Sequence, residues 1–137
     1  MGFSPSKTAW NFVGGVILKE HEIQNQIRIG TADQVTLFRT NAGTFWQGKR
    51  VYSKEFGQDV LINLRRVDGL PDGYSDLSGV RHSDGKAVFL EVKTPTGTVR
   101  PAQNRFIKRM RELGAIAGVC RSVEDAMELI GGTYHDP

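Results

Sequence analysis

Glu91 and Lys93 place an acid and an amine two residues apart at the end of the apolar run FLEVK. Side chains of a β-strand alternate between its two faces, so in a strand these two residues share one face and Val92 points to the other. A solvated cross-strand ion pair is the ordinary interpretation of such residues. The preceding AVFL is apolar on both faces, as in a central strand. Burying charged side chains at such a strand costs free energy, so their presence indicates a function. We therefore interpret the pair as part of a candidate site.

Asp76 is a second carboxylate that a hairpin would bring to this pair. It lies in the strand-like segment YSDLSGV, and Glu91 lies in KAVFLEVK. The connecting RHSDGK contains Asp84-Gly85, a pair that favours a tight turn, so the two segments predict an antiparallel hairpin. If Asp76 faces the same way as Glu91, two carboxylates converge. A register shift of one residue would turn Asp76 to the opposite face.

Two carboxylates a few ångströms apart repel each other, so they are normally tolerated around a bound cation or with a shared proton. Oxygen ligands without histidine or cysteine favour Mg²⁺ or Mn²⁺. Such a cation would polarise a phosphoryl oxygen and help to generate hydroxide from water. Lys93 would orient the hydroxide or offset charge in the transition state. The pattern points to hydrolysis of a phosphodiester.

Hydrophobic periodicity and turn signals predict the elements that position these residues. Together they indicate one α/β domain with a mixed sheet flanked by helices. Pro101 and Gly114 bracket the helix after the candidate site, and Ser122, with Asp125 three positions later, begins the last helix as a loose capping box. The other expected elements are a helix over 18–29, a strand and turn over 34–43, an irregular hairpin or long loop over 44–59, a strand over 60–67 and a buried strand over 115–120.

Composition sets only loose limits on function. The 137 residues are 39% hydrophobic and 24% charged, which suits a single core, and the net charge of +3 permits a polyanionic partner without requiring one. Cys120 is the only cysteine, which excludes an internal disulfide and favours a reducing, intracellular compartment. No apolar run has the length of a membrane span, and the first residues lack the pattern of a secretory signal.

Five segments occur in an order that resembles the VRR-NUC family of the PD-(D/E)XK nuclease superfamily, which includes stand-alone members in phages and viruses. The segments are EHEIQ, GLPDGYSDLSGV, FLEVK, RPAQNRFIKRMRELGA and VCRSVEDA, and they span most of the chain. The resemblance implies a restriction-endonuclease-like core with a mainly four-stranded mixed sheet, in a single nuclease domain over 18–137. Residues 1–17 are an N-terminal extension without an assigned role.

The resemblance also implies a role for each matching residue. Asp76 and Glu91 match the metal-binding acids, and the carbonyl of Val92 completes such a site in the family. Lys93 matches the catalytic lysine. Gln103 matches a glutamine that the family places beside that lysine, although capping of its own helix is an equally compatible role.

Two assignments have a rival nearby. Glu20 matches the acid of the first helix and shares a helix face with Gln24 one turn later, which favours Glu20 over Glu22. The literal Pro71-Asp72 precedes Gly73 in an expected turn, so the acid of the site is taken to be Asp76 rather than Asp72.

Basic and aromatic residues are candidates for contact with nucleic acid. The helix after the site carries several cations, which form either a phosphate-binding surface or an ordinary solvated face: Arg100, Arg105, Lys108 and Arg109. Phe45 and Trp46 could stack on bases, but packing is the more common role of such residues.

The implied activity is a Mg²⁺- or Mn²⁺-dependent endonuclease acting on DNA. Stand-alone members of the family resemble resolvases, which implies branched DNA such as a four-way junction, and symmetric cutting of two strands favours a homodimer. A phage-encoded protein would act in the host cytoplasm. A non-catalytic nucleic-acid-binding module on the same fold and a sequence-specific restriction endonuclease remain open alternatives.

Overall fold

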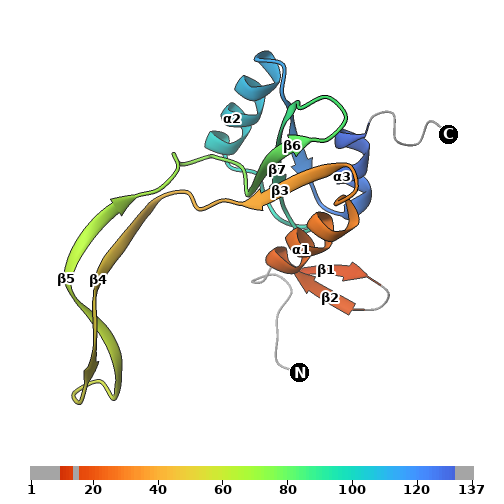
Figure 1. The fold of residues 1–137 in the computed structure, drawn as a ribbon. Helices are drawn as coiled ribbons and strands as arrows, with labels where there is room; N and C mark the ends of the chain where they lie inside the picture. Colours follow the sequence, from red (N-terminus) through yellow and green to blue (C-terminus); the bar gives the residue numbers. More distant parts are fainter. Residues whose placement is uncertain (1–9, 14–15, 132–137) are drawn as a thin grey trace. The chain divides into compact units, whose positions relative to one another are not determined.

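The computed structural model describes residues 10–13 and 16–131, which form two compact units. Of the described residues, those up to Thr40 and those from Gly73 onward form one unit, and Asn41–Asp72 form the other. Each unit has its own strands, and the helices belong to the first (Figure 1). None of the helices in the described part of the chain combines the length and apolar character of a membrane span.

The first unit contains all elements that position the candidate site. In chain order they are β1 (Trp10–Val13), β2 (Val16–Lys19), α1 (Glu20–Gly30), β3 (Val35–Arg39), β6 (Leu77–Arg81), β7 (Ala87–Val92), α2 (Pro101–Glu112), β8 (Ile116–Cys120) and α3 (Val123–Ile130). Strands β1 and β2 form a separate antiparallel pair. The central sheet has the order β3-β6-β7-β8, with β7 and β8 parallel and the other neighbours antiparallel. This confirms the predicted four-stranded mixed sheet flanked by helices, an arrangement consistent with a restriction-endonuclease-like core.

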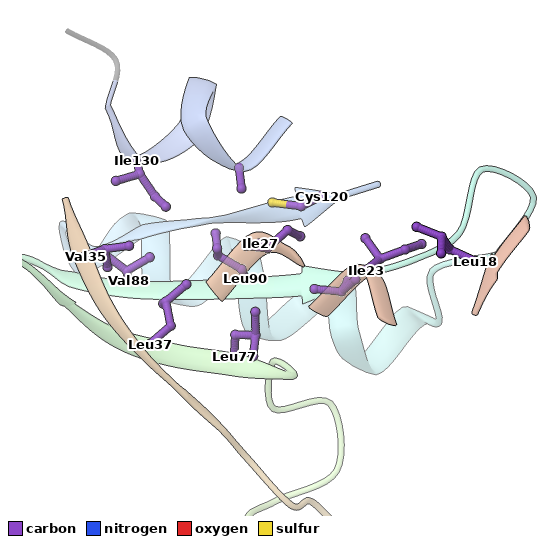
Figure 2. Packing of buried hydrophobic residues seen from close by; sticks show 12 residues of the cluster. Leu18, Ile23, Ile27, Val35, Leu37, Leu77, Val88, Leu90, Cys120 and Ile130 are labelled. Carbon is purple, nitrogen blue, oxygen red and sulfur yellow. The ribbon is translucent and has the colours of Figure 1, made fainter. Parts of the chain in front are cut away.

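The hydrophobic core lies between one face of this sheet and helices α1 and α3. Ile23 and Ile27 lie one helical turn apart on α1 and are almost fully buried, and Ile130 of α3 joins them. Figure 2 shows these side chains converging with apolar residues of all four strands. Burial of one such side chain contributes about 1.5–3 kcal/mol, so this face of the sheet anchors the fold. The residues that the central sheet contributes to the cluster are Val35, Leu37, Leu77, Val88, Leu90, Val92 and Cys120.

Helix α2 covers the opposite face of β7. Phe106 of α2 packs edge-to-face on Phe89 of β7, with ring centroids 5.4 Å apart, and against Tyr74 at 4.7 Å. Because side chains alternate along β7, the face that carries Phe89 also carries Glu91. The helix that packs on Phe89 therefore lies beside the candidate site.

The helix boundaries agree with the sequence predictions except at the first helix. Leu18 belongs to β2, so the predicted start at residue 18 is wrong and α1 begins at Glu20. Ser122 caps α3 as predicted, because its hydroxyl accepts a hydrogen bond from the Asp125 N–H. The capping box is not formed, since the Asp125 carboxylate accepts from the Arg121 N–H instead.

The second unit is a two-stranded antiparallel ribbon of β4 (Thr44–Ser53) and β5 (Gln58–Asp68). Of the two alternatives expected for residues 44–59, an irregular hairpin or a long loop, the hairpin is confirmed. Its one irregularity in register lies between Gln47 and Lys49, opposite Asn63, which has a φ of 55°. Most side chains of β4 are exposed, so this strand lacks the alternation of buried and exposed residues by which a sequence pattern indicates a strand.

Candidate active site

The hairpin of β6 and β7 brings Asp76 beside Glu91. Leu77 pairs with Leu90 in the antiparallel register, so the residue before Leu77 stands opposite the residue after Leu90. Leu77 and Leu90 point into the core, and Asp76 and Glu91 therefore share the other face. Oδ2 of Asp76 accepts a hydrogen bond of 2.8 Å from the Val92 N–H, which fixes the carboxylate at the end of the strand.

Glu91 is a buried acid, with 1% of its surface exposed to solvent. Its Oε2 atom accepts a hydrogen bond of 2.8 Å from the Gln103 amide and lies 3.8 Å from the Lys93 ammonium. Its Oε1 atom accepts no hydrogen bond from any donor in the described residues. Burial raises the pKa of Glu91 to about 8, and the nearby Asp76 carboxyl adds to this shift while Lys93 opposes it.

Lys93 directly follows β7, on the same face as Glu91, and its side chain is 12% exposed. Its backbone N–H donates to the Cys120 carbonyl at 3.0 Å, which continues the parallel pairing of β7 and β8 by one residue. The intervening Val92 side chain points into the core. The alternation predicted from the sequence is therefore present, with the acid and the amine on one face.

Gln103 combines the two roles that its spacing left open. Its Oε1 atom accepts a hydrogen bond of 2.8 Å from the Arg100 N–H and so caps the start of α2. Its amide donates to Glu91 at the same time. The side chain thus ties the first turn of α2 to the buried acid, rather than to Lys93 directly.

Glu20 and Glu22 have different surroundings at the start of α1. The Glu22 carboxylate accepts from the Lys19 N–H at 2.9 Å and serves as a cap. Burial raises the pKa of Glu20, and the Asp76 charge raises it further while Lys93 lowers it. Glu20 is therefore electrostatically coupled to the group of Asp76, Glu91 and Lys93.

The donor set suits a hard divalent cation. An unpaired oxygen on a buried acid that faces a second carboxylate is an arrangement that a cation would stabilise. The described residues contain no group of three or more histidine, cysteine, aspartate or glutamate side chains placed to hold a metal ion. A cation would therefore rely on Asp76, Glu91, a main-chain carbonyl such as that of Val92, and water, as Mg²⁺ commonly does.

The predicted nucleic-acid-binding residues lie on exposed positions of α2 and its N-cap. Arg100 is the N-cap residue, and Arg105, Lys108 and Arg109 follow on the helix. Arg109 forms a solvent-exposed ion pair of 3.6 Å with Glu112. In the ribbon unit, Phe45 and Trp46 of β4 are exposed.

Cys120 is a buried residue of β8, as predicted, and burial raises the pKa of its thiol to about 12. Arg121, the next residue, contacts the turn after Lys93 but was not among the predicted site residues. Its presence in the segment VCRSVEDA was the only available signal, and that signal indicated no contact.

Comparison with protein families identifies the domain that carries these residues. The model of the VRR-NUC domain matches residues 19–124, a span that contains every residue of the site described above. A search of curated proteins gave no match. Because the family match covers most of the chain, the protein belongs to the VRR-NUC family of PD-(D/E)XK-type nucleases.

Proposed function

We propose that this protein is a divalent-metal-dependent endonuclease that hydrolyses phosphodiester bonds in DNA. The observation that carries the proposal is the meeting of Asp76 and Glu91 on one face of the sheet, with Lys93 beside them. Membership of a nuclease family supports DNA as the substrate. An Mg²⁺ or Mn²⁺ ion at this site would supply charge neutralisation at the reacting phosphate.

Each side chain has a separate task in this proposal. Asp76 and Glu91 would hold the cation, and the backbone N–H of Val92 keeps Asp76 in place. Gln103 orients Glu91 by its hydrogen bond to Oε2 and leaves Oε1 available. Lys93 orients the attacking water or offsets charge on the phosphate, because its ammonium lies against the same carboxylate.

The proposed substrate is branched DNA, cut by a homodimer in the cytoplasm. The exposed cations of α2 support contact with phosphates rather than with a long base sequence. Two symmetric incisions in a four-way junction require two sites, which a two-fold dimer provides. Sedimentation of the protein with and without a junction tests the dimer directly, and a species of one chain under both conditions would contradict it.

Cleavage of end-labelled four-way junction, flap and linear DNA, with Mg²⁺, Mn²⁺ or EDTA, tests the activity. We expect cutting with either metal and none with EDTA. Glu91→Gln and Lys93→Ala should each lower the cleavage rate by about 10²-fold or more, while DNA affinity stays close to that of the wild type. Cleavage that survives both substitutions would contradict the proposal. Binding without cleavage would indicate a non-catalytic module, and discrete cuts in linear duplex would indicate a restriction endonuclease.

Glu20→Gln and Glu22→Gln form a matched pair for the acid of α1. Each removes one negative charge from the same helix turn, but Glu20 interacts with the charges of Asp76 and Lys93, whereas Glu22 caps the helix. We expect Glu20→Gln to lower the cleavage rate about 10- to 100-fold. Glu22→Gln keeps an oxygen that can accept from the Lys19 N–H and should cut normally. Equal losses in the two variants would remove Glu20 from the site.

A further inference from the structure

Arg121 holds the turn that follows Lys93. In this turn, the Gly97 N–H donates to the Thr94 carbonyl at 3.0 Å. Nη1 of Arg121 donates to the same Thr94 carbonyl and, at 2.9 Å, to the Gly97 carbonyl. A single guanidinium group therefore bridges both ends of the turn.

The base of Arg121 is itself fixed by β8 and α3. Arg121 directly follows Cys120, whose carbonyl accepts the Lys93 N–H. The Arg121 N–H donates to the Asp125 carboxylate at 2.9 Å, and Asp125 lies in the first turn of α3. The guanidinium thus connects the turn to an anchored part of the fold.

The turn lies close to Lys93 and leads into α2. Thr94 is fully buried, and a Cβ atom built on Gly97 would lie 3.5 Å from Cβ of Lys93. A displacement of this turn would therefore move Lys93. It would also shift the start of α2, where Gln103 binds Glu91.

We propose that Arg121 is a positioning residue that keeps Lys93 and Gln103 in place by bridging the turn over residues 94–97. This role rests on the nuclease function proposed above. The positioning role requires a guanidinium group that reaches two carbonyl groups from one anchored position. A positive charge without this geometry would not bridge the turn. A misplacement of about 1 Å in an active site costs roughly 10²-fold in rate, so this restraint matters for catalysis.

Arg81 provides a matched control at the other end of the sheet. It ends β6, whereas Asp76 precedes that strand. Its Nη1 atom donates to the Ile130 carbonyl, and it forms an ion pair of 2.6 Å with Asp84. Arg81→Ala therefore removes an arginine that bridges to a carbonyl, but away from Lys93.

The experiment compares Arg121→Ala, Arg121→Lys and Arg81→Ala in single-turnover cleavage at saturating junction DNA and Mg²⁺. We expect Arg121→Ala to lower the rate about 10- to 100-fold with an unchanged Kd for DNA. Arg121→Lys should recover only part of this loss, since a lysine keeps the charge but not the bridge. Arg81→Ala should cut at the wild-type rate even if its Tm falls.

Amide hydrogen exchange over residues 93–97 gives a readout that does not depend on cleavage. Exchange should become faster in Arg121→Ala and stay unchanged in Arg81→Ala. If the wild type cuts no DNA, the nuclease proposal fails, and this measurement still decides whether Arg121 restrains the turn. Three results would overturn the proposal: unchanged exchange in Arg121→Ala, equal rate losses in both alanine variants, or a loss confined to DNA affinity.

Discussion

At the scale of single residues, Glu91 shows how a fold maintains an acid in an unfavourable place. The carboxyl group is removed from water, faces Asp76 and has one oxygen without a donor in the described residues. Ionisation without a cation is therefore costly, which is why the pKa of Glu91 rises to about 8. A bound cation would lower the free-energy cost of ionising this carboxyl group.

Glu91 should make the metal-free protein less stable as pH rises. Its pKa in the folded state, about 8, exceeds the ordinary value of 4.5. Between these values the folded protein binds a proton that the unfolded chain releases, so this stabilisation is present below pH 4.5 and is lost as pH approaches 8. We expect the free energy of unfolding of the wild type, measured with urea in EDTA, to fall relative to Glu91→Gln as pH rises from 5 to 9.

Addition of Mg²⁺ at high pH is the control for this prediction. A cation that binds the folded state stabilises it by mass action, so the wild type should regain stability and Glu91→Gln should gain less. A difference between the two proteins that stays constant with pH would show that Glu91 ionises normally.

At the scale of elements, the close approach of α2 to the turn before β6 sets the geometry of the site. Gly73 has a φ of 90°, and a Cβ atom built there would lie 2.6 Å from the Ala102 carbonyl oxygen. Ala102 is the neighbour of Gln103. Glycine at residue 73 therefore allows the turn that leads to Asp76 to pack directly on the helix that carries Gln103.

Gly73→Ala and Gly85→Ala separate backbone strain from this packing. Gly85 also has a positive φ, 74°, but a Cβ atom there would meet nothing within 4 Å. Both substitutions should cost about 1–2 kcal/mol from the left-handed backbone. Gly73→Ala should cost about 1–3 kcal/mol more from the clash, and it should lower the cleavage rate because α2 must move. Urea unfolding and cleavage assays of both variants measure this. Equal costs would show that α2 is not held by the contact.

At the scale of the whole molecule, the two units differ in how they are stabilised. The buried cluster between the sheet and α1 and α3 contains no residue of Asn41–Asp72. The two strands of the ribbon unit start and finish next to each other, since the Gly69 N–H donates to the Gly43 carbonyl at 2.8 Å. A short turn can therefore connect these two glycines.

Replacement of residues 44–68 by Asn-Gly should leave the first unit folded. We expect circular dichroism to show a cooperative thermal transition, with a loss of stability well below that of Ile27→Ala, which should cost about 2–5 kcal/mol. Ile27 is fully buried in the cluster, so it is the reference for a core change. A shortened chain that does not unfold cooperatively would show that the first unit needs the ribbon.

Local signals predicted most of the central sheet and all three helices, the first with a start two residues too early. The apolar run AVFL, with Asp84-Gly85 before it, indicated the hairpin of β6 and β7, and the two-residue period of a strand placed Glu91 and Lys93 on one face. Proline at the first position of α2 and the serine cap of α3 marked helix starts correctly. These signals depend on neighbours within a few residues, so one sequence is enough to interpret them. The strand over residues 44–53 carries no such signal, because its side chains are mostly exposed and no buried face imposes a period of two.

Strand periodicity and turn residues were enough to predict which side chains share a strand face, which turns need glycine and which acids and amine could form a nuclease site, and helix spacing already favoured Glu20 over Glu22. The interaction of Glu20 with the charges of Asp76 and Lys93, the hydrogen bond from Gln103 to Glu91 and the bridge of Arg121 over the turn after Lys93 came only from the folded structure. The physical reason is that faces follow from the short period of the backbone, whereas contacts between distant segments depend on how α1, α2 and β8 pack on the sheet.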